Sequence, residues 1–386
     1  MKMTRYLNKI FAVGDDIMVN SEELKWIVTV TEHSENYMKP DFFVTRRGLQ
    51  SQCTETGSVE LRNFRALAEN VDVDYQFGKL CNWSVRDCIS AVIEFKVKLT
   101  PKDFGKMVCY LQHLCRDDES STYYGMVCDS VDIWLVVCTG GKAIKRKDLK
   151  WTDGQSFELI QGFFSKRNAW RTLLDYFCSS FSVKLVNSDA FLGCGASGRV
   201  FKVVDAAGVY HALKIVHSTE PTVIAAVQAE ISTVQEIKTS GGNTVTIENM
   251  ALYFDLNHQC ATGVGYLMAE VGKIFSAEEC RNNKNIATRA FDALHDLHKL
   301  RRYHGDPRLP NLINYNNQLI WIDFMRANST AVDKVDFSLY VIHDFNSLFS
   351  SIYGEKPNAK VRALLGQYAK KTDKKLHQAL LESFIV

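Results

Sequence analysis

One segment in the second half of the chain constrains its fold more than any other feature. It places the polar residues His304, Asp306 and Asn311 just before the run 313–322, and Asp323 follows that run directly. We expect the run to form a tight β-hairpin. Such a hairpin brings Asn311 and Asp323 together, because they lie next to its two ends.

These residue types, in this order, suit phosphoryl transfer. The reaction needs a carboxylate that orients the attacking hydroxyl group and accepts its proton, together with oxygen ligands for Mg²⁺. Asp306 is the candidate for the first role, and Asn311 and Asp323 are the candidates for the second. Arg308, two residues after Asp306, carries a planar guanidinium that is a good partner for phosphate.

A glycine-rich segment lies upstream, between two strand patterns. Gly193, Gly195 and Gly198, followed by Val200, leave room for backbone N–H groups to approach a triphosphate. In a dinucleotide-binding loop the glycines lead into a helix, but here they lead into the strand pattern at 200–204. The segment therefore favours the kinase type of glycine-rich loop.

The next strand and helix supply further candidates. A turn predicted at 205–208 leads into a strand that holds Ala212 and Lys214, and a helical pattern follows at 222–237. Glu230 lies on that helix, sixteen residues beyond Lys214, where its carboxylate can pair with the lysine.

Taken together, the glycine segment, Lys214, Glu230, the H-x-D-x-x-x-x-N pattern and the Asp-Phe pair resemble the protein-kinase-like superfamily. The resemblance implies a compact bilobal domain over 185–386 that binds ATP and Mg²⁺. Its N-lobe is expected over 185–270 and its C-lobe over 271–386.

The same resemblance implies roles for individual residues. Glu270 stands at the hinge that binds adenine through its backbone, Asp344 and His304 steady the catalytic loop, and Arg308 stands where a residue contacts the γ-phosphate. The implied ATP-binding residues are Gly193, Gly195, Gly198, Val200, Ala212, Lys214, Glu230 and Glu270.

The chain also departs from the family pattern. Gly305 replaces the usual arginine, Met325 replaces the last glycine of D-F-G, and no A-P-E motif follows. Without that arginine, we do not expect activation-loop phosphorylation to be the switch. These departures leave a pseudokinase as the alternative to an active enzyme.

The first half carries a second pattern, Pro-Asp followed by Glu-x-Lys. Asp41 follows a proline, Glu94 and Lys96 share one face of a predicted strand at 89–99, and Gln112 lies on a predicted helix at 102–115. The pattern resembles the PD-(D/E)xK restriction-endonuclease-like fold. It implies that the two carboxylates bind a divalent cation, that the lysine polarises the phosphate or the water, and that this domain contacts DNA.

The two patterns predict a two-domain α+β or α/β chain. A mixed-sheet, restriction-endonuclease-like domain is expected over 1–170, with strand 89–99, helix 102–115 and a hairpin over 122–138 at its centre. The join to the kinase-like domain is placed between 165 and 185.

Composition excludes several classes of protein. Lys and Arg number 46 against 44 Asp and Glu, so neither a histone-like basic chain nor an acidic tail is present. The eleven cysteines form no C-x-x-C pair, which indicates a reduced compartment. No apolar run reaches the length of a membrane span, so a soluble cytoplasmic or nuclear protein without a membrane partner is expected. The basic segment 142–150 fits a nuclear import signal, a phosphate contact or a solvated loop.

The order of the two domains resembles the carboxy-terminal modules of Crinkler-type effectors and the related fungal-type kinases. That resemblance implies action in a host cell, often in its nucleus. Three functions stay open: a phosphotransferase that moves the γ-phosphate to a hydroxyl acceptor, expected to be a protein with a small molecule as the alternative; a metal-dependent DNA nuclease with a regulatory pseudokinase; and a non-enzymatic scaffold.

Overall fold

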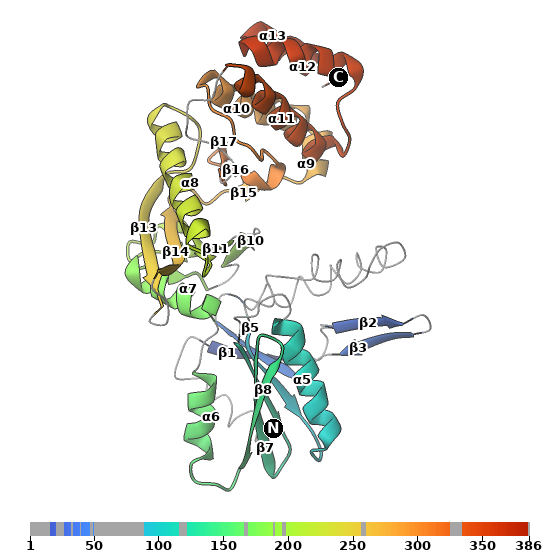
Figure 1. Cartoon of the computed structure of the whole chain (residues 1–386), viewed down its shortest axis with the longest axis vertical. Coiled ribbons are helices and arrows are strands. Elements are labelled where there is room, and N and C mark those ends of the chain that lie inside the picture. Colours follow the sequence, from blue (N-terminus) through green and yellow to red (C-terminus); the bar gives the residue numbers. More distant parts are fainter. Residues whose placement is uncertain are drawn as a thin grey trace. The chain divides into compact units, whose positions relative to one another are not determined.

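The computed structural model shows a mixed α+β protein (Figure 1). It describes residues 16–20, 27–31, 34–38, 40–46, 49, 89–115, 122–165, 169–187, 190–194, 198–255, 260–324 and 334–384. The chain divides into two compact units, Met1–Val204 and Asp205–Val386. This division falls after the predicted join at 165–185, which stays a prediction.

Unit 1 is built on a six-stranded sheet in which β5 and β6 run parallel and the other neighbours run antiparallel. The order of the strands is β1 (Asp16–Asn20), β4 (Phe42–Arg46), β5 (Ile89–Phe95), β6 (Thr122–Cys128), β7 (Asp132–Thr139) and β8 (Ala143–Lys150). The predicted β-α-β-β order is confirmed, because α5 (Pro101–Cys115) joins β5 to β6 and a turn at Asp129 joins β6 to β7. The first strand ends at Phe95 and is therefore shorter than predicted.

Helix α5 packs against β6 and β7 (Figure 1). Its apolar face buries Met107, Tyr110 and Leu111. Gly125 of β6 lies under this face, where a Cβ would clash with Met107. Strands of a parallel βαβ unit are apolar along their length when both faces of the sheet are covered. β5 fits this rule, since it is buried along nearly its whole length.

Unit 1 also contains two further helices and five strands outside the six-stranded sheet, within the residues that the structure describes. β2 and β3 pair with each other, and β11 pairs with β9 and β10. Their bounds, with those of the two helices, are β2 (Ile27–Thr31), β3 (Ser34–Met38), α6 (Ser156–Phe164), α7 (Ala169–Ser180), β9 (Lys184–Leu185), β10 (Phe191–Cys194) and β11 (Gly198–Val204).

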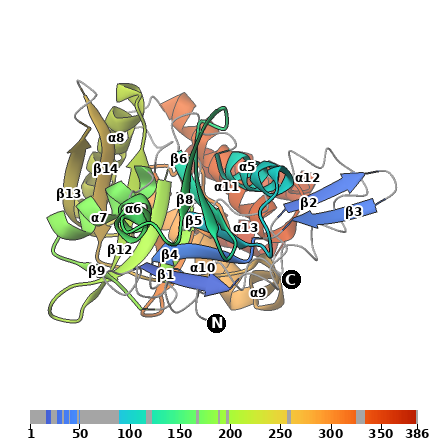
Figure 2. The same ribbon diagram turned by 90° about the horizontal axis from the view of Figure 1, so that it is seen from below.

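Unit 2 begins with antiparallel strands in the order β12 (Tyr210–His217), β14 (Ala261–Met268) and β13 (Ile247–Phe254). Helix α8 (Pro221–Thr239) lies alongside β13 and β14 (Figure 2). The turn predicted at 205–208 is confirmed: Asp205 accepts hydrogen bonds from the N–H groups of Ala207 and Val209, and Gly208 has φ +83°.

A three-stranded sheet and a set of helices complete unit 2. The sheet has the order β15 (Lys273–Ile274), β16 (Leu312–Tyr315) and β17 (Gln318–Trp321). The hairpin predicted at 313–322 is confirmed, since β16 and β17 pair around Asn316 and Asn317, both of which have positive φ. The helices are α9 (Ala277–Asn282), α10 (Lys284–Lys299), α11 (Lys334–Tyr353), α12 (Ala359–Lys371) and α13 (Lys374–Glu382).

Helices α10 to α13 pack on one another through apolar faces. On α10, Ala290, Leu294 and Leu297 are buried. Across the described ranges, we find no helix that has both the length and the apolar character of a membrane span.

Candidate functional site

Lys214 lies at the centre of a buried charge cluster in unit 2. Its Nζ atom is 3.1 Å from Oε1 of Glu230 and 3.2 Å from Oδ1 of Asp323. Strand β12 positions the lysine and helix α8 the glutamate, while Asp323 follows β17 at the end of the hairpin. The structure therefore brings together three residues that the sequence assigns to one phosphate site.

The neighbouring side chains keep Lys214 charged, whereas burial raises the pKa of Glu230 above its ordinary value. Burial opposes the charge on Lys214, but Tyr266, Glu230 and Asp323 outweigh it and raise the pKa of Lys214 well above its ordinary value. The hydroxyl of Tyr266 also donates a hydrogen bond to Glu230 at 3.3 Å. An ammonium group held this way is a fixed positive charge that can attract an anion.

Asp323 and Phe324 point to different environments. Phe324 is fully buried and its ring lies 4.5 Å from that of His304. Asp323 has φ +66°, in the left-handed region that Asp tolerates better than most residues. A sparsely populated backbone conformation held at a cluster of charges is common at functional sites.

Asp344 of α11 anchors the loop that carries the other candidates. Its buried carboxylate accepts hydrogen bonds from the backbone N–H groups of His304, at 2.7 Å, and Gly305, at 2.9 Å. Burial opposes ionisation of Asp344, but hydrogen bonds from His298 and His343 outweigh it and hold its pKa far below the usual range. The steadying role implied for Asp344 thus has a direct physical basis.

The loop geometry also explains the departure at Gly305. This residue has φ +82°, where a side chain would strain the backbone. His304 is buried, and its Nδ1 atom accepts a hydrogen bond from the N–H of Asp306. The ring proton is therefore on Nε2, which donates a hydrogen bond to the carbonyl of Ile322 at 3.0 Å. His304 therefore ties the loop to the residue before Asp323. Burial lowers the pKa of His304, which keeps it neutral.

The carboxylate of Asp306 is engaged by Arg308. The guanidinium donates from Nε to Oδ1 at 2.7 Å and from Nη2 to Oδ2 at 2.6 Å. Asn311 donates from Nδ2 to the backbone carbonyl of Asp306 at 2.9 Å, which leaves its Oδ1 atom for a cation. A hydroxyl acceptor must therefore share the Asp306 carboxylate with Arg308.

Other residues of the kinase-type prediction are placed as follows. The side chain of Glu270 is buried and accepts hydrogen bonds from the N–H and hydroxyl of Thr246, while its predicted backbone role stays a prediction. Ala212 is buried in β12. Gly193, Gly198 and Val200 belong to β10 and β11 of unit 1, and Gly195 and Met325 lie outside the described residues.

Unit 1 holds a second charge cluster, around Glu94. The buried Glu94 Oε1 is 2.6 Å from Nζ of Lys96 and 2.7 Å from Nζ of Lys106, and Oε2 accepts a hydrogen bond from the N–H of Asp41 at 3.2 Å. The Asp41 carboxylate accepts from the N–H of Phe95 at 2.6 Å. The predicted Asp41, Glu94 and Lys96 are therefore neighbours.

The structure does not bring Gln112 to this cluster. Gln112 is exposed and donates to the carbonyl of Gly141, which lies in the turn after Thr139. Thr139 pairs with the first residue of β6, whereas Glu94 pairs with Val127 near the other end of that strand. The spacing on the helix instead places Lys106 at Glu94, a residue that the sequence reasoning did not single out.

The Glu94 cluster is a poor fit for a divalent cation as it stands. Both Glu94 oxygens have partners, and two ammonium groups lie where a cation would bind. Burial raises the pKa of Asp41, which also weakens it as a ligand. Within the described residues, no group of three or more Asp, Glu, His or Cys side chains could hold a metal ion.

The N–H of Ile322, the residue before Asp323, donates to the carbonyl of Asn311 at 2.9 Å. The magnesium role of Asn311 and Asp323 stays a prediction, which would require only one or two protein oxygens together with the phosphates of a nucleotide. No family model matches the chain, and a search of curated proteins found no match either.

Proposed function

We propose that unit 2 is an ATP- and Mg²⁺-dependent phosphotransferase of the protein-kinase type. The observation that carries the proposal is Lys214, whose ammonium contacts Glu230, 16 residues away, and Asp323, 109 residues away. A buried lysine shared by a helix carboxylate and an aspartate at a hairpin end suits the binding of nucleotide phosphates.

In this proposal each of the candidate site residues has one role. Lys214 holds phosphate oxygens, with Glu230 fixing the position of its ammonium group. Asn311 and Asp323 hold Mg²⁺, which when bound offsets the negative charge of the phosphates. Asp306 orients the acceptor hydroxyl and takes its proton, and Arg308, which shares the Asp306 carboxylate, contacts the transferred phosphate.

Two parts of the proposal rest on the sequence alone. Gly193, Gly195, Gly198 and Val200 are assigned to the triphosphate by their motif, and Glu270 to adenine by its position. Action in the cytoplasm or nucleus, including that of a host cell, is supported by the Crinkler-type order of motifs.

Transfer of phosphate from labelled ATP in the full chain tests the proposal. Wild type should transfer or hydrolyse the γ-phosphate, Lys214→Ala should lose the thermal shift produced by Mg²⁺ and ATP, and Asp306→Asn should keep the shift but lose transfer. Lys284→Ala and Asp296→Asn, on exposed positions of α10, are the matched controls. Equal inactivity of wild type and variants, with all of them folded and none shifted by nucleotide, would refute the proposal.

A second candidate function is supported by the cluster in unit 1. Asp41, Glu94 and Lys96 are neighbours, and this supports metal-dependent DNA cleavage as an alternative. Cleavage that Glu94→Gln abolishes and Asp306→Asn leaves intact would favour it. The hydrogen bonds to Lys96 and Lys106 must open before a metal binds, which makes this the weaker candidate.

A further inference from the structure

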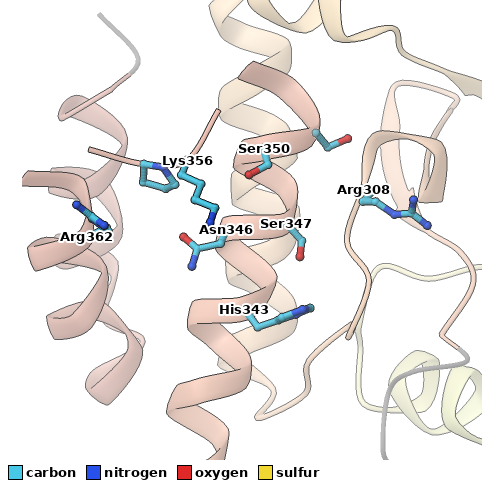
Figure 3. Close-up of a pocket in the computed structure, with 9 residues that line it drawn as sticks. Arg308, His343, Asn346, Ser347, Ser350, Lys356 and Arg362 are labelled. Carbon is cyan, nitrogen blue, oxygen red and sulfur yellow. The ribbon is translucent and has the colours of Figure 1, made fainter. Parts of the chain in front are cut away.

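A pocket of about 640 Å³ adjoins the loop that carries Asp306 (Figure 3). It lies entirely within unit 2, and its lining side chains come from the loop that carries Asp306, from α11, from the segment between α11 and α12, and from α12 (Figure 3). They are Arg308, His343, Asn346, Ser347, Ser350, Ser351, Lys356, Pro357 and Arg362. A volume in this range suits a small molecule, since such sites typically enclose about 300 to 1,000 Å³.

The lining of this pocket is positively charged. Arg308, Lys356 and Arg362 are cationic, and no Asp or Glu is among the lining residues. Within the part of the chain that the structure describes, the side chains of Lys356 and Arg362 make no ion pair or hydrogen bond. The pocket therefore offers two uncompensated cations to a bound anion.

Two further features of the lining suit a ligand that carries hydroxyl groups. Oδ1 of Asn346 is buried and has no hydrogen-bond partner among the described residues, which is costly unless a ligand supplies a donor. In Figure 3, Asn346 points to the side of α11 where Lys356 and Arg362 lie. The hydroxyl of Ser350 donates to the carbonyl of Glu355 and keeps its lone pairs for a second donor.

The pocket is joined directly to the candidate catalytic residue. Arg308 lines the pocket and also binds both carboxylate oxygens of Asp306. The N–H of Leu309 donates to the hydroxyl of Ser351, another lining residue, at 3.0 Å. Only the side chain of Arg308 therefore separates a molecule in the pocket from Asp306. Ser351 hydrogen-bonds this side of the pocket to the loop that carries Asp306.

We propose that this pocket binds the phosphate acceptor, and that the acceptor is a small hydroxyl compound that already carries a phosphate monoester. The inference rests on the proposed phosphotransferase function. The existing phosphate pairs with Lys356 and Arg362, and a hydroxyl of the same molecule reaches Asp306. The hydroxyl oxygen then bonds to the γ-phosphorus of ATP, the bond from that phosphorus to the β-γ bridging oxygen breaks, ADP leaves, and the hydroxyl proton passes to Asp306.

Calorimetric titration of the full chain with inorganic phosphate, glucose 6-phosphate, glucose and a phosphoserine peptide tests the inference. Wild type should bind phosphate and glucose 6-phosphate saturably and should not bind glucose. Arg362→Gln and Lys356→Gln should each weaken this binding about tenfold, as expected for one lost charge-assisted contact. Lys370→Gln, an exposed change on the same helix outside the pocket, is the matched control and should leave binding unchanged.

The outcomes separate this inference from the function on which it rests. If the full chain transfers phosphate from ATP while neither phosphate nor glucose 6-phosphate binds, or if Arg362→Gln binds them as wild type does, the pocket assignment is wrong and the phosphotransferase stands. If only the phosphoserine peptide binds, the acceptor is a peptide and the inference is also overturned. If the esters bind through Arg362 but ATP never does, the proposed function fails on its own. Lys214→Ala should retain ester binding, which shows that the esters do not occupy the nucleotide site.

Discussion

Replacement of Asp344 by Asn tests whether one buried carboxylate organises the loop of unit 2. Oδ2 of Asp344 accepts from the N–H of His304 and lies 3.3 Å from Nε2 of His298, while Oδ1 accepts from the N–H of Gly305. Asparagine keeps the shape but has a single acceptor oxygen. In either orientation of the amide, one backbone N–H then faces an NH₂ group inside a fully buried site.

The expected loss of free energy follows from this one backbone N–H that is left without an acceptor. Losing one hydrogen bond to a charged acceptor and leaving its buried donor unsatisfied costs about 3 kcal/mol. Because the donors belong to the loop itself, the loss should appear as local opening around His304 and Gly305. An opening free energy lower by about 3 kcal/mol corresponds to exchange that is about a hundredfold faster.

Hydrogen exchange of the full chain, read by mass spectrometry on peptides that span 300–312, measures this effect together with urea unfolding. Asp296→Asn is the control, because it makes the same chemical change on α10 where the side chain is 62% exposed. Faster exchange confined to the loop, with wild-type exchange in unit 1, is expected. The reasoning is refuted if Asp344→Asn keeps wild-type protection at the loop and wild-type unfolding.

Three further predictions concern other parts of the chain. Glu230→Gln should lower the free energy of unfolding by about 3 kcal/mol in urea titrations, because it removes a carboxylate partner of the buried Lys214. Burial and a neighbouring histidine lower the pKa of His295 to about 4, so the unfolded chain takes up a proton below about pH 6.5 that the folded chain refuses. The free energy of unfolding is therefore highest above that pH and falls by up to about 3 kcal/mol as the pH approaches 4. In urea titrations, the difference in this free energy between pH 7 and pH 4.5 should be smaller in His295→Gln than in wild type. Gly125→Ala should destabilise unit 1 by about 1 to 3 kcal/mol through the clash with Met107, and its loss should be smaller when it is made in a Met107→Ala background than in wild type.

The local elements of this protein could be predicted because their signals lie within a few residues. The hairpin at 313–322 and the turn at 205–208 both form where the sequence places them. The order of strand, helix and hairpin in unit 1 follows from apolar periodicity, although the first strand is shorter than its apolar pattern. The predicted pairing of Lys214 with Glu230 also appears, since a strand and the following helix leave few ways for the two to meet.

Side-chain contacts that depend on tertiary packing could not be predicted from the sequence. Lys106 and Gln112 lie on the same helix, and only the register of that helix against the sheet decides which of them reaches Glu94. Similarly, nothing in the spacing of Asp306 and Arg308 shows that the arginine binds both carboxylate oxygens. Side-chain direction depends on packing as well as on spacing.

The sequence by itself determined the candidate residues, their order and the short elements that carry them, because these depend on residue type and local backbone preference. The tertiary structure decided that Asp323 meets Lys214, that Asp344 holds the loop, and that Lys356 and Arg362 line a pocket beside it. Those contacts join residues far apart in the chain, and their geometry is set by how helices and sheets pack rather than by any local pattern.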